Sequence, residues 1–211
     1  MTVVGIVPAA GRGERLGAEG PKAFVACAGR PLIEWSLDVL RSVCDRVVVA
    51  VPPGYSLADS VEGGPVRSDS VRRALAAAPE ATVVVVHDAA RPLITRDLVE
   101  RCVAALGEGF DGAIAASPVT DTIKEADPGR RVLRTLDRSS LWAIQTPQAF
   151  TAAVLRRALN VPLDVLAAAT DDASLVEAAG GAVTVVEAPP DNFKVTSAAD
   201  LERAALALRS S

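Results

Sequence analysis

The stretch VVGIVPAAGRGERLG at residues 3–17 says most about the fold. Its apolar run at residues 3–7 predicts a buried strand, which ends at Pro8 in a loop of small residues. Such a loop lets backbone N–H groups approach phosphate oxygens closely, and Arg15 and Lys22 can neutralise a polyphosphate. We therefore expect a nucleotide substrate, although an ordinary β–α turn is the alternative for the loop taken alone.

Two well-known phosphate-binding patterns do not describe this loop. The dinucleotide-binding pattern G-x-G-x-x-G would need a third glycine where this chain has Leu16, and the triplet G-K-[ST] of the P-loop occurs nowhere in the chain.

Length and composition narrow the class of protein. A chain of 211 residues, 50% of them hydrophobic, predicts one α/β domain over residues 1–211. The net charge of −4 argues against a nucleic-acid binder, and no apolar run approaches the roughly 20 residues that a bilayer requires, so we expect no membrane association. Three cysteines without a C-x-x-C pair indicate reduced thiols in a cytoplasmic protein, and the lone His87 excludes a multi-histidine zinc site.

Apolar runs alternate with amphipathic segments along the chain. The runs predict strands at residues 3–7, 46–51, 82–86, 112–116 and 182–187, and helical spacing predicts helices at 32–43, 68–78, 96–106 and 198–208. This alternation is typical of a mostly parallel sheet with helices on both faces, in which ligands bind beyond the carboxyl ends of the strands. The loops that follow residues 7 and 86 should therefore meet at the functional edge.

The polar segment at residues 118–141 interrupts this alternation. It contains the turn signal Asp127-Pro128-Gly129-Arg130 between two β-like stretches, which predicts a projecting hairpin arm. Because an isolated hairpin has little core of its own, we expect the arm to pack on a second subunit and form a homodimer. A solvated insertion is the alternative.

Two acidic positions are candidates for chemistry. Asp88 follows a predicted strand, where a carboxylate can hold Mg²⁺ or accept a bond from a sugar hydroxyl. Asp171 and Asp172 form either a second acidic site or a helix start, with Thr170 or Asp171 as the N-cap.

Taken together and in order, the motifs of the whole chain resemble the 2-C-methyl-D-erythritol 4-phosphate cytidylyltransferase family. The motifs are PAAGRGERLG (8–17) with Pro21-Lys22, HDAARP (87–92), PVTDTIK (118–124), TLDRSSLW (135–142), QTPQAF (145–150), TDDAS (170–174) and DNFKVT (191–196). The resemblance implies a Rossmann-like nucleotidyltransferase fold and transfer of a cytidylyl group from CTP to methylerythritol 4-phosphate. It also implies release of pyrophosphate, a Mg²⁺ requirement, and a place in the non-mevalonate isoprenoid pathway.

The same resemblance assigns roles to residues of this chain. Arg15 and Lys22 match groups that stabilise the transition state, and Lys194 matches the lysine that orients the acceptor phosphate. The residues that match the CTP-binding set are Pro8, Ala9, Ala10, Gly11, Gly13, Lys22, Gly64, Ser70, Asp88 and Ala89. Those that match the acceptor-binding set are Asp88, Arg91, Thr135 and Lys194, with Asp88 also the metal ligand.

Two positions depart from the family pattern. Ala152 stands where the family usually has an acceptor-binding arginine, and Arg156 and Arg157, one turn later, are candidates to replace it. Pro65 stands where an acidic residue is common near the base, whereas Arg67 keeps the basic position. These departures leave two alternatives: a pentitol-phosphate cytidylyltransferase that uses ribitol 5-phosphate, and a non-catalytic nucleotide-binding protein of the same fold.

Overall fold

The computed structural model describes residues 1–11 and 20–209. Within them, a seven-stranded sheet has the order β11-β7-β10-β6-β1-β4-β5. Its strands are β1 (Val3–Pro8), β4 (Arg46–Val51), β5 (Ser60–Glu62), β6 (Val83–Val86), β7 (Gly112–Pro118), β10 (Trp142–Thr151) and β11 (Val183–Glu187). The pairs β1–β4, β1–β6, β4–β5 and β7–β11 are parallel, so the predicted mostly parallel sheet is confirmed.

Strand β10 is the exception, because it runs antiparallel between β6 and β7. The sequence pattern does not predict this strand, since a proline inside a run argues against a central strand. Here the register against β7 shifts between Ile144 and Gln148, and this irregularity contains Pro147. The strand can therefore continue past the proline on both sides of an interruption in the ladder.

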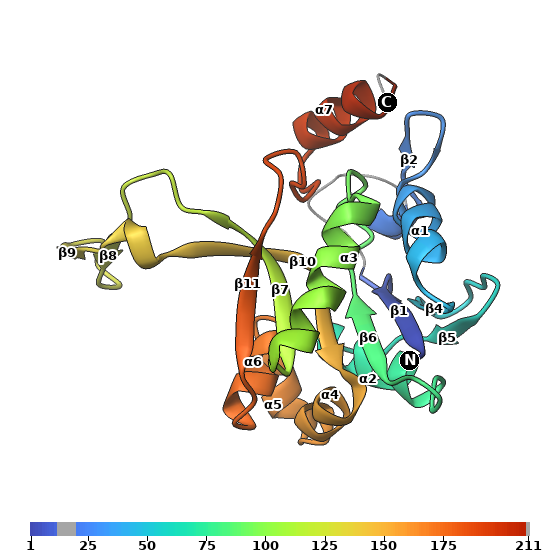
Figure 1. Ribbon diagram of the computed structural model, residues 1–211. Coiled ribbons are helices and arrows are strands. Elements are labelled where there is room, and N and C mark those ends of the chain that lie inside the picture. The colour runs from blue at the N-terminus through green and yellow to red at the C-terminus, as the bar shows by residue number, and fades with distance from the viewer. Residues whose placement is uncertain (12–19, 210–211) are drawn as a thin grey trace.

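Helices cover both faces of the sheet (Figure 1). On one face α1 (Leu32–Val43) and α3 (Arg96–Ala105) share a core with alternate strand residues such as Val7 and Val49. On the other face the core includes Ile6 and Val48 and residues of four helices, which are α2 (Arg67–Ala76), α4 (Ala152–Leu159), α5 (Leu163–Ala168) and α6 (Asp172–Ala178). Because successive strand residues point to opposite faces, both cores draw on the same strands.

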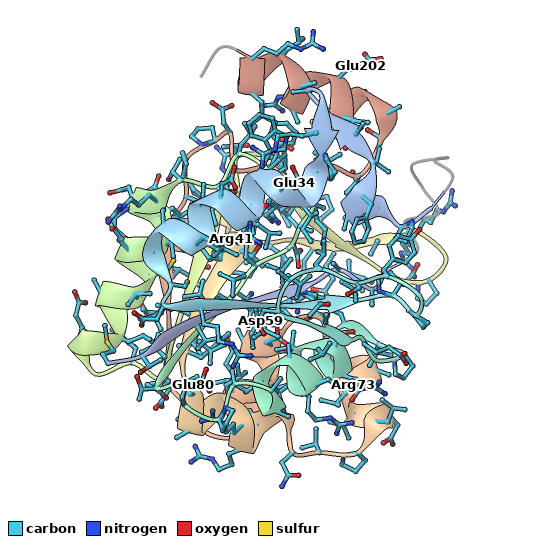
Figure 2. All side chains as sticks on the ribbon, turned by 90° about the vertical axis from the view of Figure 1, so that its right-hand side faces the viewer. Glu34, Arg41, Asp59, Arg73, Glu80 and Glu202 are labelled. Atoms are coloured by element: carbon cyan, nitrogen blue, oxygen red, sulfur yellow. The ribbon has the colours of Figure 1, made fainter. Side chains whose placement is uncertain are left out.

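Figure 2 shows the sheet nearly edge-on, with side chains filling the layers on both sides of it. Glu34 and Arg41 of α1 lie on one side of the sheet, and Arg73 of α2 lies on the other.

A smaller cluster joins the C-terminal helix α7 (Ala198–Arg209) to the rest of the chain. Cys27, Leu32, Ala90, Val195 and Ala204 form this cluster, beside the short strands β2 (Ala26–Cys27) and β3 (Arg30–Pro31). It anchors the DNFKVT segment near the end of β6, because Val195 donates a backbone hydrogen bond to Ala90. Short 3-10 helices occupy Lys22–Phe24, Leu106–Glu108 and Arg138–Ser140.

The predicted arm projects away from the sheet (Figure 1). Strands β8 (Lys124–Ala126) and β9 (Val132–Thr135) pair in antiparallel fashion across the turn that the sequence signals. Every residue of β9 is exposed.

Among the helices of the described residues, none combines the length and the apolar character that a membrane span requires.

Candidate active site

The carboxyl ends of β1 and β6 lie side by side, because these strands are parallel neighbours. Beyond them is a cavity of about 240 Å³, lined by residues of the two predicted loops, of α2 and of the DNFKVT segment. The structure thus brings together ten of the predicted site residues, namely Pro8, Ala9, Ala10, Gly11, Lys22, Gly64, Ser70, Asp88, Ala89 and Lys194. Gly13 and Arg15 lie outside the described residues.

The turn Gly63-Gly64 forms one wall of this cavity and leaves no room for side chains. A Cβ at Gly64 would lie 1.9 Å from the Asp69 carboxylate, and one at Gly63 would lie 2.4 Å from Ala10. The hydroxyl of Ser70 accepts a hydrogen bond of 3.0 Å from the Gly64 N–H. Glycine is required at both positions because a Cβ would overlap the side chains of Asp69 and Ala10.

Asp88 is held between two cations. Its Oδ2 accepts a 2.7 Å hydrogen bond from Lys194 Nζ, and its Oδ1 accepts one of 3.1 Å from Arg67 Nε. Burial alone would raise the pKa of Asp88, but Arg67 and Lys194 together lower it well below its ordinary value. Asp88 is therefore a fixed carboxylate anion at neutral pH.

His87 braces the backbone on both sides of Asp88. Since the Arg91 carbonyl can only accept, His87 Nε2 donates to it at 3.1 Å, and Nδ1 then accepts from the Thr146 hydroxyl at 3.1 Å. The same hydroxyl accepts from the Asp88 N–H at 3.0 Å. Burial lowers the pKa of His87 to about 4. At neutral pH the ring is therefore uncharged, and its role is to hold the backbone in place through hydrogen bonds and not to carry a proton.

Asn192 ties the DNFKVT segment to the same edge. Its side-chain Nδ2 donates to Gln145 Oε1 at 2.7 Å and to the backbone carbonyl of Thr146 at 2.9 Å. The backbone carbonyl of Asn192 accepts a hydrogen bond from Arg91 Nη1 at 2.7 Å. Three motifs distant in sequence are thereby joined, and Lys194 is placed two residues from this junction.

A second cavity, of about 610 Å³, adjoins the first at the root of the arm. Arg67, Asp88 and Lys194 line both cavities, so they form the wall between them. Arg91 also lines the second cavity, and its side chain is nearly buried. Among the described residues, its Nε has no hydrogen-bond partner and its guanidinium forms no ion pair with a carboxylate. A buried guanidinium in this situation is suited to bind an anion.

Four predicted positions do not line either cavity within the chain, and one of them, Arg157, is exposed on α4. Thr135 lies on the exposed arm, where its hydroxyl accepts a hydrogen bond from Lys124. Ala152 begins α4 with only 1% of its surface exposed, and its N–H donates to Thr82, just before β6 begins and so at the opposite edge of the sheet. Arg156 donates to the carbonyls of Ala78, Pro79 and Ala81 on that same side, so it is not available at the cavities as a replacement cation.

The main partner of Arg67 was not predicted from the sequence. Arg67 Nη1 donates to Asp172 Oδ2 at 2.6 Å, and Asp172 is fully buried. Asp171 caps α6 by accepting from the Ser174 N–H at 2.9 Å, which confirms one of the two expected N-caps; it also accepts from Gln148 Nε2 at 2.8 Å. The doubled aspartate was visible in the sequence, but nothing local distinguishes the capping residue from the one that pairs with Arg67.

Comparisons with known proteins identify the family and the fold of the chain. The family model for 2-C-methyl-D-erythritol 4-phosphate cytidylyltransferase matches residues 3–210. A protein of that name from Nocardia farcinica is 44% identical over 96% of this chain and 92% of its own length. The crystal structure of the Thermus thermophilus protein of that name superposes with a TM-score of 0.83 at 37% identity, covering 99% of this chain and 100% of that one. The chain therefore belongs to the 2-C-methyl-D-erythritol 4-phosphate cytidylyltransferase family.

Proposed function

We propose that this protein transfers the cytidylyl group of CTP to 2-C-methyl-D-erythritol 4-phosphate, giving 4-diphosphocytidyl-2-C-methyl-D-erythritol and pyrophosphate in isoprenoid biosynthesis. The observation that carries the proposal beyond family membership is the shared wall of the two cavities. Two anionic substrates in adjacent cavities would meet at Lys194 and Arg67, the two cations that pair with Asp88 in the shared wall.

The first cavity is assigned to CTP. Pro8 ends β1, and residues 9–11 after it offer a small-residue backbone edge to phosphates; Lys22 lines the same space. The tight Gly63-Gly64 turn with Ser70 supplies backbone and hydroxyl groups of the kind that recognise a base edge. Asp88 and Ala89 lie across the cavity, where they are assigned to the ribose and to the metal.

The second cavity is assigned to methylerythritol 4-phosphate. Arg91 and Lys194 supply the cations for its phosphate, and Gln145, Thr170 and Ser174 supply polar groups for its hydroxyls. Thr135 is assigned to the acceptor site of a partner subunit, because it lies on the projecting arm and not beside its own cavities. Ala152 has no role in this assignment, since it is buried at the other edge of the sheet.

The proposed chemistry needs alignment and charge compensation but no protein base. A phosphate oxygen of the acceptor, already anionic, attacks the α-phosphorus of CTP. The bond from that phosphorus to the bridging oxygen breaks, and pyrophosphate leaves with the electron pair. Cations fixed before the reaction stabilise the added negative charge, and we assign this role to Lys22, Lys194 and Arg15.

A Mg²⁺ ion fits the donor set only if phosphate oxygens of the substrate supply the ligands that the protein lacks. Asp88 is the one carboxylate that lines the first cavity among the described residues, and these residues hold no group of three His, Cys, Asp or Glu side chains suited to a metal. Mg²⁺ is commonly held by one or two carboxylates together with substrate phosphates. Asp88 and the triphosphate would hold the ion, which when bound supplies further charge compensation on the phosphate oxygens.

We also propose a homodimer formed through the arm and a cytoplasmic location. Val132 and Leu133 are exposed on β9, and Trp142 and Ile144 are partly exposed at the root of the arm, so each copy offers apolar surface that a second copy would cover. The three cysteines are free and buried, which suits a reducing compartment.

Pyrophosphate release by the purified protein tests the proposed function. The assay supplies Mg²⁺ and CTP with either methylerythritol 4-phosphate or ribitol 5-phosphate, and uses ATP and GTP as nucleotide controls. We expect release only with CTP and methylerythritol 4-phosphate. Release with ribitol 5-phosphate instead would identify a pentitol-phosphate enzyme, and CTP binding without release for any pair would identify a non-catalytic protein.

A further inference from the structure

Four charged side chains from four segments form a continuous line through the site. They alternate in sign: Asp172 at the start of α6, Arg67 at the start of α2, Asp88 after β6, and Lys194 in the DNFKVT segment. The contacts are 2.6 Å from Asp172 to Arg67, 3.1 Å from Arg67 to Asp88, and 2.7 Å from Asp88 to Lys194. The line runs from the buried face of α6 to the wall between the two cavities.

The Asp172 end of this line is fully buried. Its side chain is 0% exposed, Oδ2 accepts from Arg67, and Oδ1 has no partner among the described residues. Burial raises the pKa of Asp172 above its ordinary value, and the Arg67 guanidinium offsets part of that rise. A buried ion pair contributes little to net stability compared with apolar side chains of similar volume, but it imposes one geometry on its members.

That geometry controls where Arg67 can reach. Its side chain is 30% exposed and lines the first cavity, so without a tether its long side chain could turn toward a bound triphosphate. With Nη1 bonded to Asp172, Nε remains directed at Asp88 Oδ1. The planar fork of arginine suits this bridge between two carboxylates, whereas a lysine ammonium would offer only a single point of charge.

We propose that Arg67 is a positioning residue of the transfer reaction, held in place by Asp172 and acting through Asp88 and Lys194. The inference rests on the proposed function. Arg67 fixes one oxygen of Asp88 and leaves the other to Lys194, so the lysine lies at a defined place between the cavities. Arg67 also compensates the negative charge of Asp88, so that this carboxylate repels an incoming polyanion less. Asp172 contributes to the reaction by holding Arg67 in place, although it lines neither cavity.

The test uses the full-length chain and the substitution Asp172→Asn, which keeps the size of the side chain but removes its charge. We expect kcat with methylerythritol 4-phosphate to fall on the order of 10-fold, because small displacements of reacting groups are costly. The dissociation constant of CTP, measured by calorimetry, should not rise, because a released Arg67 can turn toward the triphosphate and no residue assigned to the base is changed. Asp172→Glu restores the carboxylate and should recover most of the lost turnover.

Asp59→Asn is the matched control. Asp59 forms a two-bond ion pair with Arg46 at 2.6 Å for each bond, at the amino ends of β4 and β5, whereas the cavities lie beyond the carboxyl ends of β1 and β6. Its backbone φ is 57°, a conformation that asparagine tolerates. This variant loses an aspartate charge and an arginine partner without touching the site, so its kcat should equal that of the wild type.

Two further measurements make the outcome decisive. Arg67→Lys keeps a cation on a partly exposed side chain but cannot bridge both carboxylates, so it should lose turnover even if Asp172→Asn fails to fold. A crystal structure of Asp172→Asn should show the Arg67 guanidinium displaced from Asp88.

The inference is overturned if Asp172→Asn turns over like the wild type, if Asp172→Glu recovers none of the loss, or if Arg67 keeps its bond to Asp88 in the variant crystal. Full turnover of Arg67→Lys would overturn it as well. Inactive wild-type protein would overturn the proposed function. The crystal structure of Asp172→Asn would then test by itself whether Asp172 holds Arg67 against Asp88.

Discussion

Lys22 is one of only three lysines in the chain, and it lines the cavity assigned to CTP. If it stabilises the charge that develops on the phosphates, Lys22→Ala should lower kcat by on the order of 100-fold, because it removes a preorganised cation. Steady-state pyrophosphate release measures the effect. Arg41→Ala, which removes an exposed cation from α1, serves as the control (Figure 2). Equal turnover in the two variants would remove Lys22 from the catalytic group.

His87 makes a prediction about stability and pH. Burial lowers its pKa from 6.5 to about 4, so between these values the unfolded chain binds a proton that the folded chain does not. The free energy of unfolding is therefore highest above pH 6.5 and falls as the pH decreases toward 4, by about 3 kcal/mol from this residue. Urea unfolding of the wild type and of His87→Gln across this range measures the difference. Parallel pH profiles for the two proteins would contradict the prediction.

At the scale of elements, the arm is the part of the fold that is least supported by its own chain. Strand β9 is exposed along its whole length, and Val132 and Leu133 are each more than half exposed. Replacing both with threonine keeps the β-propensity but removes apolar surface, so the proposed dimer should dissociate. Light scattering coupled to size-exclusion chromatography measures the molar mass of the wild type and of the variant in solution. Leu206→Thr, on an exposed site of α7, should leave the dimer unchanged, and a wild-type monomer would reject the arm as an interface.

The elements also show where sequence patterns succeed. The predicted helix at 32–43 and the predicted strand at 46–51 agree with α1 and β4 to the residue, because the first has apolar residues at helical spacing and the second is a β-branched run closed by Pro52-Pro53. Strand β10 escaped prediction because Pro147 and its polar neighbours obscure the pattern. Only the ladder partners on both sides, β6 and β7, make that segment a strand.

At the scale of the whole molecule, the candidate site exists only where separate layers meet. The end of β1, the loop after β6, the start of α2 and the DNFKVT segment each contribute to the first cavity. Because Asp88 alone among the described residues offers a carboxylate there, we expect metal affinity to depend on bound CTP. Chelation with EDTA should abolish turnover, and added Mg²⁺ should restore it. Calorimetry should detect Mg²⁺ binding only when CTP is present; tight binding to the free protein would contradict this arrangement.

The sequence by itself determined the alternation of strands and helices and the loops at the carboxyl ends of two strands. These properties depend on neighbouring residues, whose period and turn signals act locally. The tertiary structure alone decided which charges meet. Arg67 and Asp172 are 105 positions apart, and Asp88 and Lys194 are 106 apart. Their pairing depends on how helices and loops pack on the sheet, and no local pattern encodes a contact between such distant residues.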